Sequence, residues 1–110
     1  MDTVVVINND QMGPGDQKLG RKILATCLRK LHSACRPTAI VLYNTGVKLA
    51  LKDSGVAVEL RLLLDQGVEI LACGTCVEYF GIGDQILTDH LSNMDEILAT
   101  LDKARKVITL

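Results

Sequence analysis

The sequence predicts one α/β domain over residues 1–110, with a mostly parallel sheet covered by helices on both faces, a doubly wound arrangement. Short β-branched apolar runs alternate along the chain with longer segments of helical periodicity. Apolar residues make up 48% of the chain, which is enough for one core in a domain of this size. We see no linker, internal repeat or low-complexity segment that would divide it.

The first half of the chain predicts two buried strands around a long helix. Residues 3–8 and 39–43 are short runs rich in Val and Ile, which are typical of buried strands. Residues 16–34 are predicted as a helix, and Pro37 prevents it from continuing. Residues 47–51 alternate weakly and indicate no definite element. The apolar residues of the helix recur at three and four and are expected on one face: Leu19, Ile23, Leu24, Cys27, Leu28, Leu31 and Cys35.

The middle of the chain predicts a second helix and a third strand. Ser54 is expected to cap a helix over residues 55–66, and Gly67 to end it. Residues 68–72 are predicted as a strand that delivers the chain to a cysteine. A short helical turn is then expected over residues 74–80.

The last part of the chain is less regular at its start. Residues 84–92 are ambiguous, with a short strand expected around residues 85–88. Asn93 followed by Glu96 is a capping-box pattern that opens a helix. Residues 106–110 are predicted as a terminal strand.

Parallel sheets bind ligands at the carboxyl ends of their strands, and three loops are expected to meet there. These loops are residues 8–15, 44–48 and 73–80. The first has neither the Gly-Lys-Ser/Thr of a P-loop nor the dinucleotide fingerprint, so it is predicted to be a plain turn. The candidate substrate-binding residues of the three loops are Asn8, Asp10, Asn44, Gly46, Gly74 and Thr75.

The motif Cys73-Gly74-Thr75-Cys76 carries the candidate chemistry. Cys73 follows a buried strand and precedes a helical turn, whose N–H groups would favour its thiolate. Cys76 is expected either to form a disulfide with Cys73 or to resolve a covalent adduct on it. We therefore predict Cys73 and Cys76 as the catalytic residues.

Several other interpretations of the cysteines remain open. Free cysteines are often simply small buried hydrophobic residues. A zinc site needs four ligands, and of the other soft candidates Cys27 and Cys35 lie on the apolar face of the long helix, where core packing is the expected role, so no metal is predicted. A disulfide oxidoreductase is a weaker hypothesis, because the Trp-Cys-Gly-Pro-Cys of thioredoxins is absent. His90 is interpreted as either a proton donor or a solvated loop residue. The other soft candidates are Cys27, Cys35, His32 and His90.

Composition and charge bear on the function class. The net charge is −1, and no run of basic residues is long enough to bind along a phosphate backbone. There are only three aromatic side chains, one Phe and two Tyr, on which bases could stack. Nucleic-acid binding is therefore not expected. No apolar stretch approaches the roughly 20 residues that span a bilayer, and no signal peptide is recognisable. Four cysteines in such a chain predict reduced thiols and a cytoplasmic location. No cofactor is predicted.

Residues 67–76 together with Tyr79-Phe80-Gly81 resemble the DsrE-like sulfur-relay family. Within that family the chain is most similar to the C-terminal domain of YedF-type selenium metabolism proteins. The similarity runs from the first strand to the last residue and is sharpest in the CGTC and GVKL segments. Further support comes from residues 44–49, 92–94 and 106–109.

The resemblance implies a doubly wound fold, a homo-oligomer, and a persulfide carried at the position of Cys73. It implies a sulfur or selenium relay with donor and acceptor proteins, among them a TusA-like carrier. YedF-type proteins usually have a TusA-like domain before this one, so a stand-alone version or an excised domain is expected here. The alternative is a non-catalytic oligomeric binding or assembly module with structural cysteines.

Overall fold

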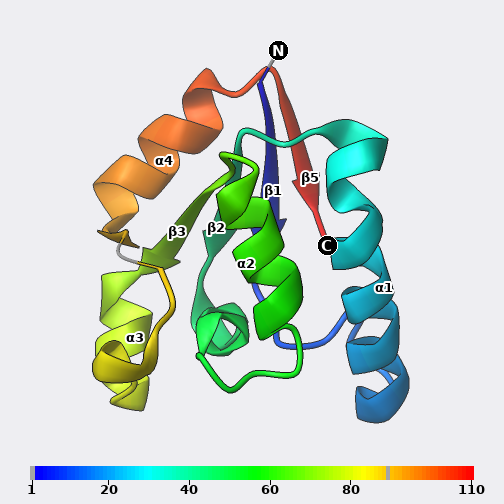
Figure 1. The fold of residues 1–110 in the computed structure, drawn as a ribbon. Helices are drawn as coiled ribbons and strands as arrows, with labels where there is room; N and C mark the ends of the chain where they lie inside the picture. Colours follow the sequence, from blue (N-terminus) through cyan, green and yellow to red (C-terminus); the bar gives the residue numbers. More distant parts are fainter. Residues whose placement is uncertain (1, 89) are drawn as a thin grey trace.

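The computed structural model describes residues 2–88 and 90–110, which form a five-stranded sheet of order β4-β3-β2-β1-β5 (Figure 1). Every neighbouring pair of strands is parallel. The predicted α/β class is confirmed, and the named strands form a wholly parallel sheet. The strands are β1 (Thr3–Ile7), β2 (Ala39–Leu42), β3 (Glu69–Cys73), β4 (Leu91–Ser92) and β5 (Lys106–Thr109).

Helices cover both faces of this sheet. Helices α1 and α2 contact each other in front of the sheet in Figure 1. Helix α4 connects β4 at one edge of the sheet to β5 at the other edge. Because crossovers between parallel strands are right-handed, α4 lies on the face opposite to α1 and α2. No helix in the described ranges is long and apolar enough to cross a membrane. The helices are α1 (Gln17–Cys35), α2 (Ala57–Asp65), α3 (Gly74–Phe80) and α4 (Met94–Lys103), with 3-10 helices η1 (Asn44–Ala50) and η2 (Gly83–Gln85).

The core lies on both sides of the central strands. All residues of β1 and β2 are buried, as their continuous apolar runs predicted. Leu24, Leu28 and Leu31 of α1 pack into this core. Leu19 and Ile23, which were predicted on the same apolar face, are instead exposed, because they lie at the edge of a stripe that the sheet does not reach.

The irregular segments differ most from prediction. Residues 47–51 lie mainly in η1, and Leu51 forms an isolated antiparallel bridge with Ile86. The prediction of a strand around residues 85–88 is wrong, because the edge strand of the sheet is β4, at Leu91–Ser92. Only Leu91 and Ser92 pair with β3, which is too short a run to produce a recognisable pattern. The ambiguous stretch 84–92 also includes Asp89, which lies outside the described residues.

Two helix caps follow the sequence and one does not. Asn93 accepts a 2.9 Å hydrogen bond from the Glu96 N–H at the start of α4, as expected. Ser54 does not cap α2: its hydroxyl donates to the Leu49 carbonyl, and the helix begins two residues later than predicted. Gly67 follows α2 with φ 88°, the left-handed conformation for which glycine was predicted there.

Candidate functional site

The three predicted loops meet at the carboxyl ends of the strands, at the lower end of the sheet in Figure 1. The Thr45 hydroxyl accepts a 3.2 Å hydrogen bond from the Asp10 N–H and donates one of 3.3 Å to Asn9 Oδ1. The Tyr43 N–H donates to the Ile7 carbonyl at 3.3 Å. These bonds tie the segment after β2 to the segment after β1.

Two of the predicted substrate-binding residues, Gly46 and Gly74, allow the chain segments to approach closely. A Cβ atom on Gly46 would overlap the carbonyl oxygen of Ile7. A Cβ atom on Gly74 would lie 3.0 Å from the Ser92 carbonyl oxygen, tighter than ordinary contact. Neither glycine lines the cavity at this edge. Their evident role is to let η1 and α3 sit against the neighbouring strands.

A cavity of about 350 Å³ opens where η1, α3 and the start of α4 come together. Three predicted site residues, Asn44, Thr75 and Cys76, contribute to its wall. Tyr79 is 84% exposed and Met94 49% exposed, so the cavity has an apolar, accessible rim. The lining residues are Tyr43, Asn44, Thr75, Cys76, Tyr79, Phe80 and Met94.

The two cysteines of the motif occupy different environments. Cys76 is partly buried and lines the cavity, whereas Cys73 is only 3% exposed and belongs to the core. The sequence favoured Cys73 as the reactive thiolate, and in the structure it is Cys76 that lines the cavity. Cys73 ends β3, where it pairs with Ser92 of β4, and its side chain packs in the hydrophobic core. Within the described chain, no N–H of α3 donates to the Cys73 side chain.

The Cys76 sulfur is held by a neighbouring loop. The Asn44 N–H donates a 3.1 Å hydrogen bond to Cys76 Sγ. Asn44 has φ 53°, a left-handed conformation that Asn tolerates better than most residues. The structure therefore brings Asn44 and Cys76 together as predicted, although through the main chain of Asn44.

Burial and two neighbouring residues, Asn44 and Cys73, act on the ionisation of Cys76. Burial raises the pKa of the Cys76 thiol, the Asn44 N–H lowers it, and the neighbouring Cys73 raises it again. The net effect on the pKa is an increase. Cys73 raises the pKa first through a side-chain hydrogen bond with Cys76, and then because two adjacent thiolates would repel each other. At neutral pH the resting Cys76 is thus mostly protonated.

An aromatic pair lines the cavity beside Cys76, and a lysine that lines a separate cavity contacts one of the two rings. The rings of Tyr79 and Phe80 meet edge to face with their centroids 5.3 Å apart. Lys48 Nζ lies 4.4 Å from the centroid of the Phe80 ring, a cation–π contact. Lys48 and Phe80 lie in two of the loops that were predicted to meet, but neither was predicted as a site residue. Tyr43 and Met94 were missed as well, since their placement depends on how η1 and α4 pack.

The remaining predicted residues lie away from the cysteines. Asp10 forms an ion pair of 3.4 Å with Arg21 and lines a second cavity of about 400 Å³, between α1 and the segment before α2. Asn8 is half-buried and lines neither cavity. The predicted set thus separates into three cavity residues, two packing glycines and two residues elsewhere, besides the buried Cys73.

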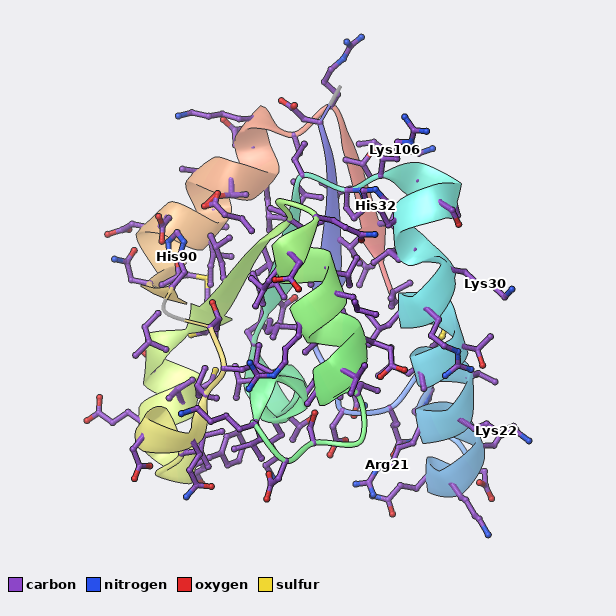
Figure 2. All side chains as sticks on the ribbon, in the orientation of Figure 1. Arg21, Lys22, Lys30, His32, His90 and Lys106 are labelled. Carbon is purple, nitrogen blue, oxygen red and sulfur yellow. The ribbon has the colours of Figure 1, made fainter. Side chains whose placement is uncertain are left out.

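His90 belongs to a separate polar cluster near the start of α4 (Figure 2). Its Nε2 lies 2.9 Å from Glu96 Oε1, and its Nδ1 lies 3.3 Å from Glu69 Oε1. The Ser92 hydroxyl also donates to Glu96 Oε1, at 2.5 Å. The Ser92 hydrogen bond and then that of His90 hold the pKa of Glu96 below its usual range. This cluster does not line the cysteine cavity.

The cysteine and histidine side chains that were considered as metal ligands do not gather at one place in this fold. Cys27, His32 and Cys35 all lie on α1, on the other side of the molecule from His90 (Figure 2 labels both histidines). Among residues 2–88 and 90–110, no three His, Cys, Asp or Glu side chains are grouped so that they could hold a metal ion. Figure 2 also shows Lys22 and Lys30 pointing outward along α1.

Solved structures of other proteins share this fold. The YchN protein from E. coli superposes with a TM-score of 0.71 at 23% identity, over 100% of both chains. MTH1491 from Methanobacterium thermoautotrophicum gives a TM-score of 0.72 at 23% identity, over 99% of this chain and 98% of that one. BT1422 from Bacteroides thetaiotaomicron gives 0.69 at 21% identity, over 99% and 95%. At such identities the likeness establishes the fold alone.

A comparison with curated proteins found no match. Similarity to the YedF type therefore stays a prediction. The model of the DsrE/DsrF-like family, in contrast, matches residues 1–110. Sequence and fold thus agree over the whole length, and the chain belongs to the DsrE/DsrF-like family.

Proposed function

We propose that this protein is a sulfur or selenium relay, a persulfide carrier in which Cys76 receives the cargo and Cys73 assists it. One observation carries the proposal: Cys76 Sγ lies in the wall of an accessible cavity and is held there by the Asn44 N–H. Membership of the DsrE/DsrF-like family supports a relay role. The proposal moves the persulfide from Cys73, where the resemblance placed it, to the neighbouring thiol that lines the cavity.

The transfer needs only sulfur chemistry. The Cys76 thiolate attacks the terminal sulfur of a donor persulfide, R–S–SH, and the donor leaves as its thiolate. The product is Cys76–S–SH, or Cys76–S–SeH when the donor carries selenium. The Asn44 N–H points at the sulfur and stabilises its negative charge. Neither a metal nor a nucleotide takes part in this exchange.

The rim of the cavity suits a protein partner. Tyr79 and Met94 present exposed apolar surface beside Cys76, and aromatic and Met side chains are enriched where proteins bind one another. We propose that donor and acceptor proteins, a TusA-like carrier among them, dock over this rim. We also propose that the protein is a homo-oligomer. Because the reaction needs free thiols, we place it in the reducing cytoplasm.

The second candidate function is an assembly module whose cysteines are structural. The burial of Cys73 and the raised pKa of Cys76 favour it. It predicts that Cys76 reacts no faster with an alkylating reagent than Cys27 and Cys35, which are partly buried on α1. Alkylation of Cys76 ahead of both would remove this candidate.

Loading with a small persulfide donor tests the relay. The background is a chain carrying Cys27→Ala and Cys35→Ala, so that only the motif cysteines remain. In this background we compare Cys73→Ala with Cys76→Ala by intact mass spectrometry. We expect Cys73→Ala to gain one sulfur atom and Cys76→Ala to gain none. Equal uptake by both variants, or no uptake by Cys73→Ala, would overturn the assignment.

A further inference from the structure

Resting on the proposed function, we infer that Cys73 discharges the persulfide on Cys76 as free hydrosulfide by closing a Cys73–Cys76 disulfide. The protein would then be a reductive releasing device as well as a carrier. With a selenium cargo, the released species would be hydroselenide.

The two cysteines are spaced for a disulfide. Cys73 caps α3 and Cys76 lies in its first turn. Residues three apart at the start of a helix have Cα atoms about 5 Å apart, which falls within the roughly 4.4–6.8 Å that disulfides span. Both are free thiols in the structure. The two side chains are adjacent, since Cys73 raises the pKa of Cys76 through a side-chain hydrogen bond and charge repulsion.

Their positions also select which sulfur is attacked. Cys76 faces the cavity, so the terminal sulfur of a persulfide on it has room there. Cys73 is buried among core residues and does not line that cavity. It therefore approaches the inner sulfur, Cys76 Sγ, from the side away from the terminal sulfur. Displacement at sulfur favours this in-line arrangement, with the leaving atom expelled into the cavity.

The step is balanced without an external oxidant. Cys73 loses its proton, its Sγ forms a bond to Cys76 Sγ, and the bond from Cys76 Sγ to the terminal sulfur breaks. The terminal sulfur leaves with the electron pair as HS⁻ and is thereby reduced, the Cys73 sulfur is oxidised, and Cys76 Sγ exchanges one S–S bond for another. A small dithiol, such as dithiothreitol, then regenerates both thiols for another cycle.

The burial of Cys73 determines that loading of Cys76 comes before release of sulfide. An incoming donor meets Cys76 at the cavity and does not reach Cys73, which is 3% exposed. Cys73 can react only with what Cys76 already carries. Sulfur on Cys76 would thus pass to a docked acceptor when one is present and leave as sulfide when none is.

Sulfide release from the loaded protein tests the inference. The Cys27→Ala/Cys35→Ala chain, with both motif cysteines, is mixed with a small persulfide donor, freed of excess donor without reductant, and followed with a sulfide electrode. We expect one sulfide per bound sulfur and loss of both alkylatable thiols. Release should be roughly tenfold or more faster than from the loaded Cys73→Ala variant, because an intramolecular thiol acts at a high effective concentration.

The outcomes separate this inference from the proposed function. If Cys73→Ala takes up no sulfur, the relay itself fails and the inference fails with it. If Cys73→Ala is loaded but loses sulfide as fast as the chain with both cysteines, the relay stands and the inference is wrong. A Cys73→Ser variant guards against a packing defect, because serine fills the buried site but cannot form the disulfide. It should retain its persulfide as Cys73→Ala does.

Discussion

The main-chain N–H of Asn44 donates a hydrogen bond of 3.1 Å to Cys76 Sγ. The residue after β2 thereby positions a thiol carried on the helix after β3, two segments far apart in sequence. This bond is also the one influence that lowers the pKa of Cys76, against burial and the neighbouring Cys73. The reactivity of the thiol is therefore set by three parts of the fold that meet at one edge of the sheet.

Removing Cys73 should make Cys76 ionise more easily. Cys73 raises the pKa of Cys76, so Cys73→Ala should shift the midpoint of Cys76 alkylation against pH to a lower value. Below that midpoint the variant should react faster than the chain with both motif cysteines. Both chains carry Cys27→Ala and Cys35→Ala, and the rate is followed by mass spectrometry from pH 6 to about 10, a range that brackets the ordinary thiol value. An unchanged or higher midpoint would contradict the proposed coupling.

Gly46→Ala should destabilise the fold. The added Cβ would overlap the carbonyl oxygen of Ile7, so either β1 or η1 must shift. We expect a loss of about 1–3 kcal/mol in the free energy of unfolding, as for other overpacked sites. Gly55→Ala is the matched control, because its Cβ would meet nothing within 4 Å. Equal midpoints of urea unfolding for the two variants would show that the loop tolerates the methyl group.

Glu96 should stabilise the fold in a pH-dependent way. The pKa of Glu96 is lowered in the folded state. The stability that its carboxylate contributes is therefore fully present at pH values above the ordinary pKa of Glu, and it is lost as the pH falls through the lowered pKa. The difference in melting temperature between the wild type and Glu96→Gln should therefore shrink on acidification. Ser92→Ala, which removes the hydrogen bond that lowers the pKa of Glu96 most, should weaken the same dependence. A difference that stays constant from neutral to acidic pH would argue against this role.

Tyr79 should matter for protein partners and not for small donors. Tyr79→Ala removes an exposed aromatic side chain beside Cys76, so transfer from a persulfidated TusA-like protein should slow by roughly tenfold, about 1.4 kcal/mol. Loading by a small persulfide should be nearly unchanged. Leu19→Ala removes a side chain that is 56% exposed on α1 and serves as the control. If Leu19→Ala slows protein transfer as much as Tyr79→Ala, the docking surface lies elsewhere.

Local patterns were sufficient to predict most of the fold. The buried runs of β1, β2 and β3 and the periodicity of α1 each act within one segment, so the sequence displays them directly. Strand β4 escaped prediction because it consists of only Leu91 and Ser92. Its position is fixed by pairing with the end of β3, a contact that no local pattern encodes.

The site could be located from the sequence but not oriented. The alternation of strands and helices and the positions of the loops indicated the end of the sheet where the cavity lies, and the motif that contributes Cys76 to its wall. Which cysteine faces outward depends on how α3 turns against β4, and the Gly74 contact with Ser92 contributes to that turn. The contacts of Met94 and Tyr43 with the cavity likewise arise only after η1 and α4 have packed.

Localising the first bound sulfur tests the central proposal most directly. The chain with all four cysteines is treated briefly with a limiting small persulfide donor, alkylated, and sequenced by tandem mass spectrometry across the Cys73–Cys76 segment. We predict that the earliest added sulfur lies on Cys76, and that Cys73, Cys27 and Cys35 carry no added sulfur. An added sulfur found first on Cys73 would contradict the assignment made from the structure.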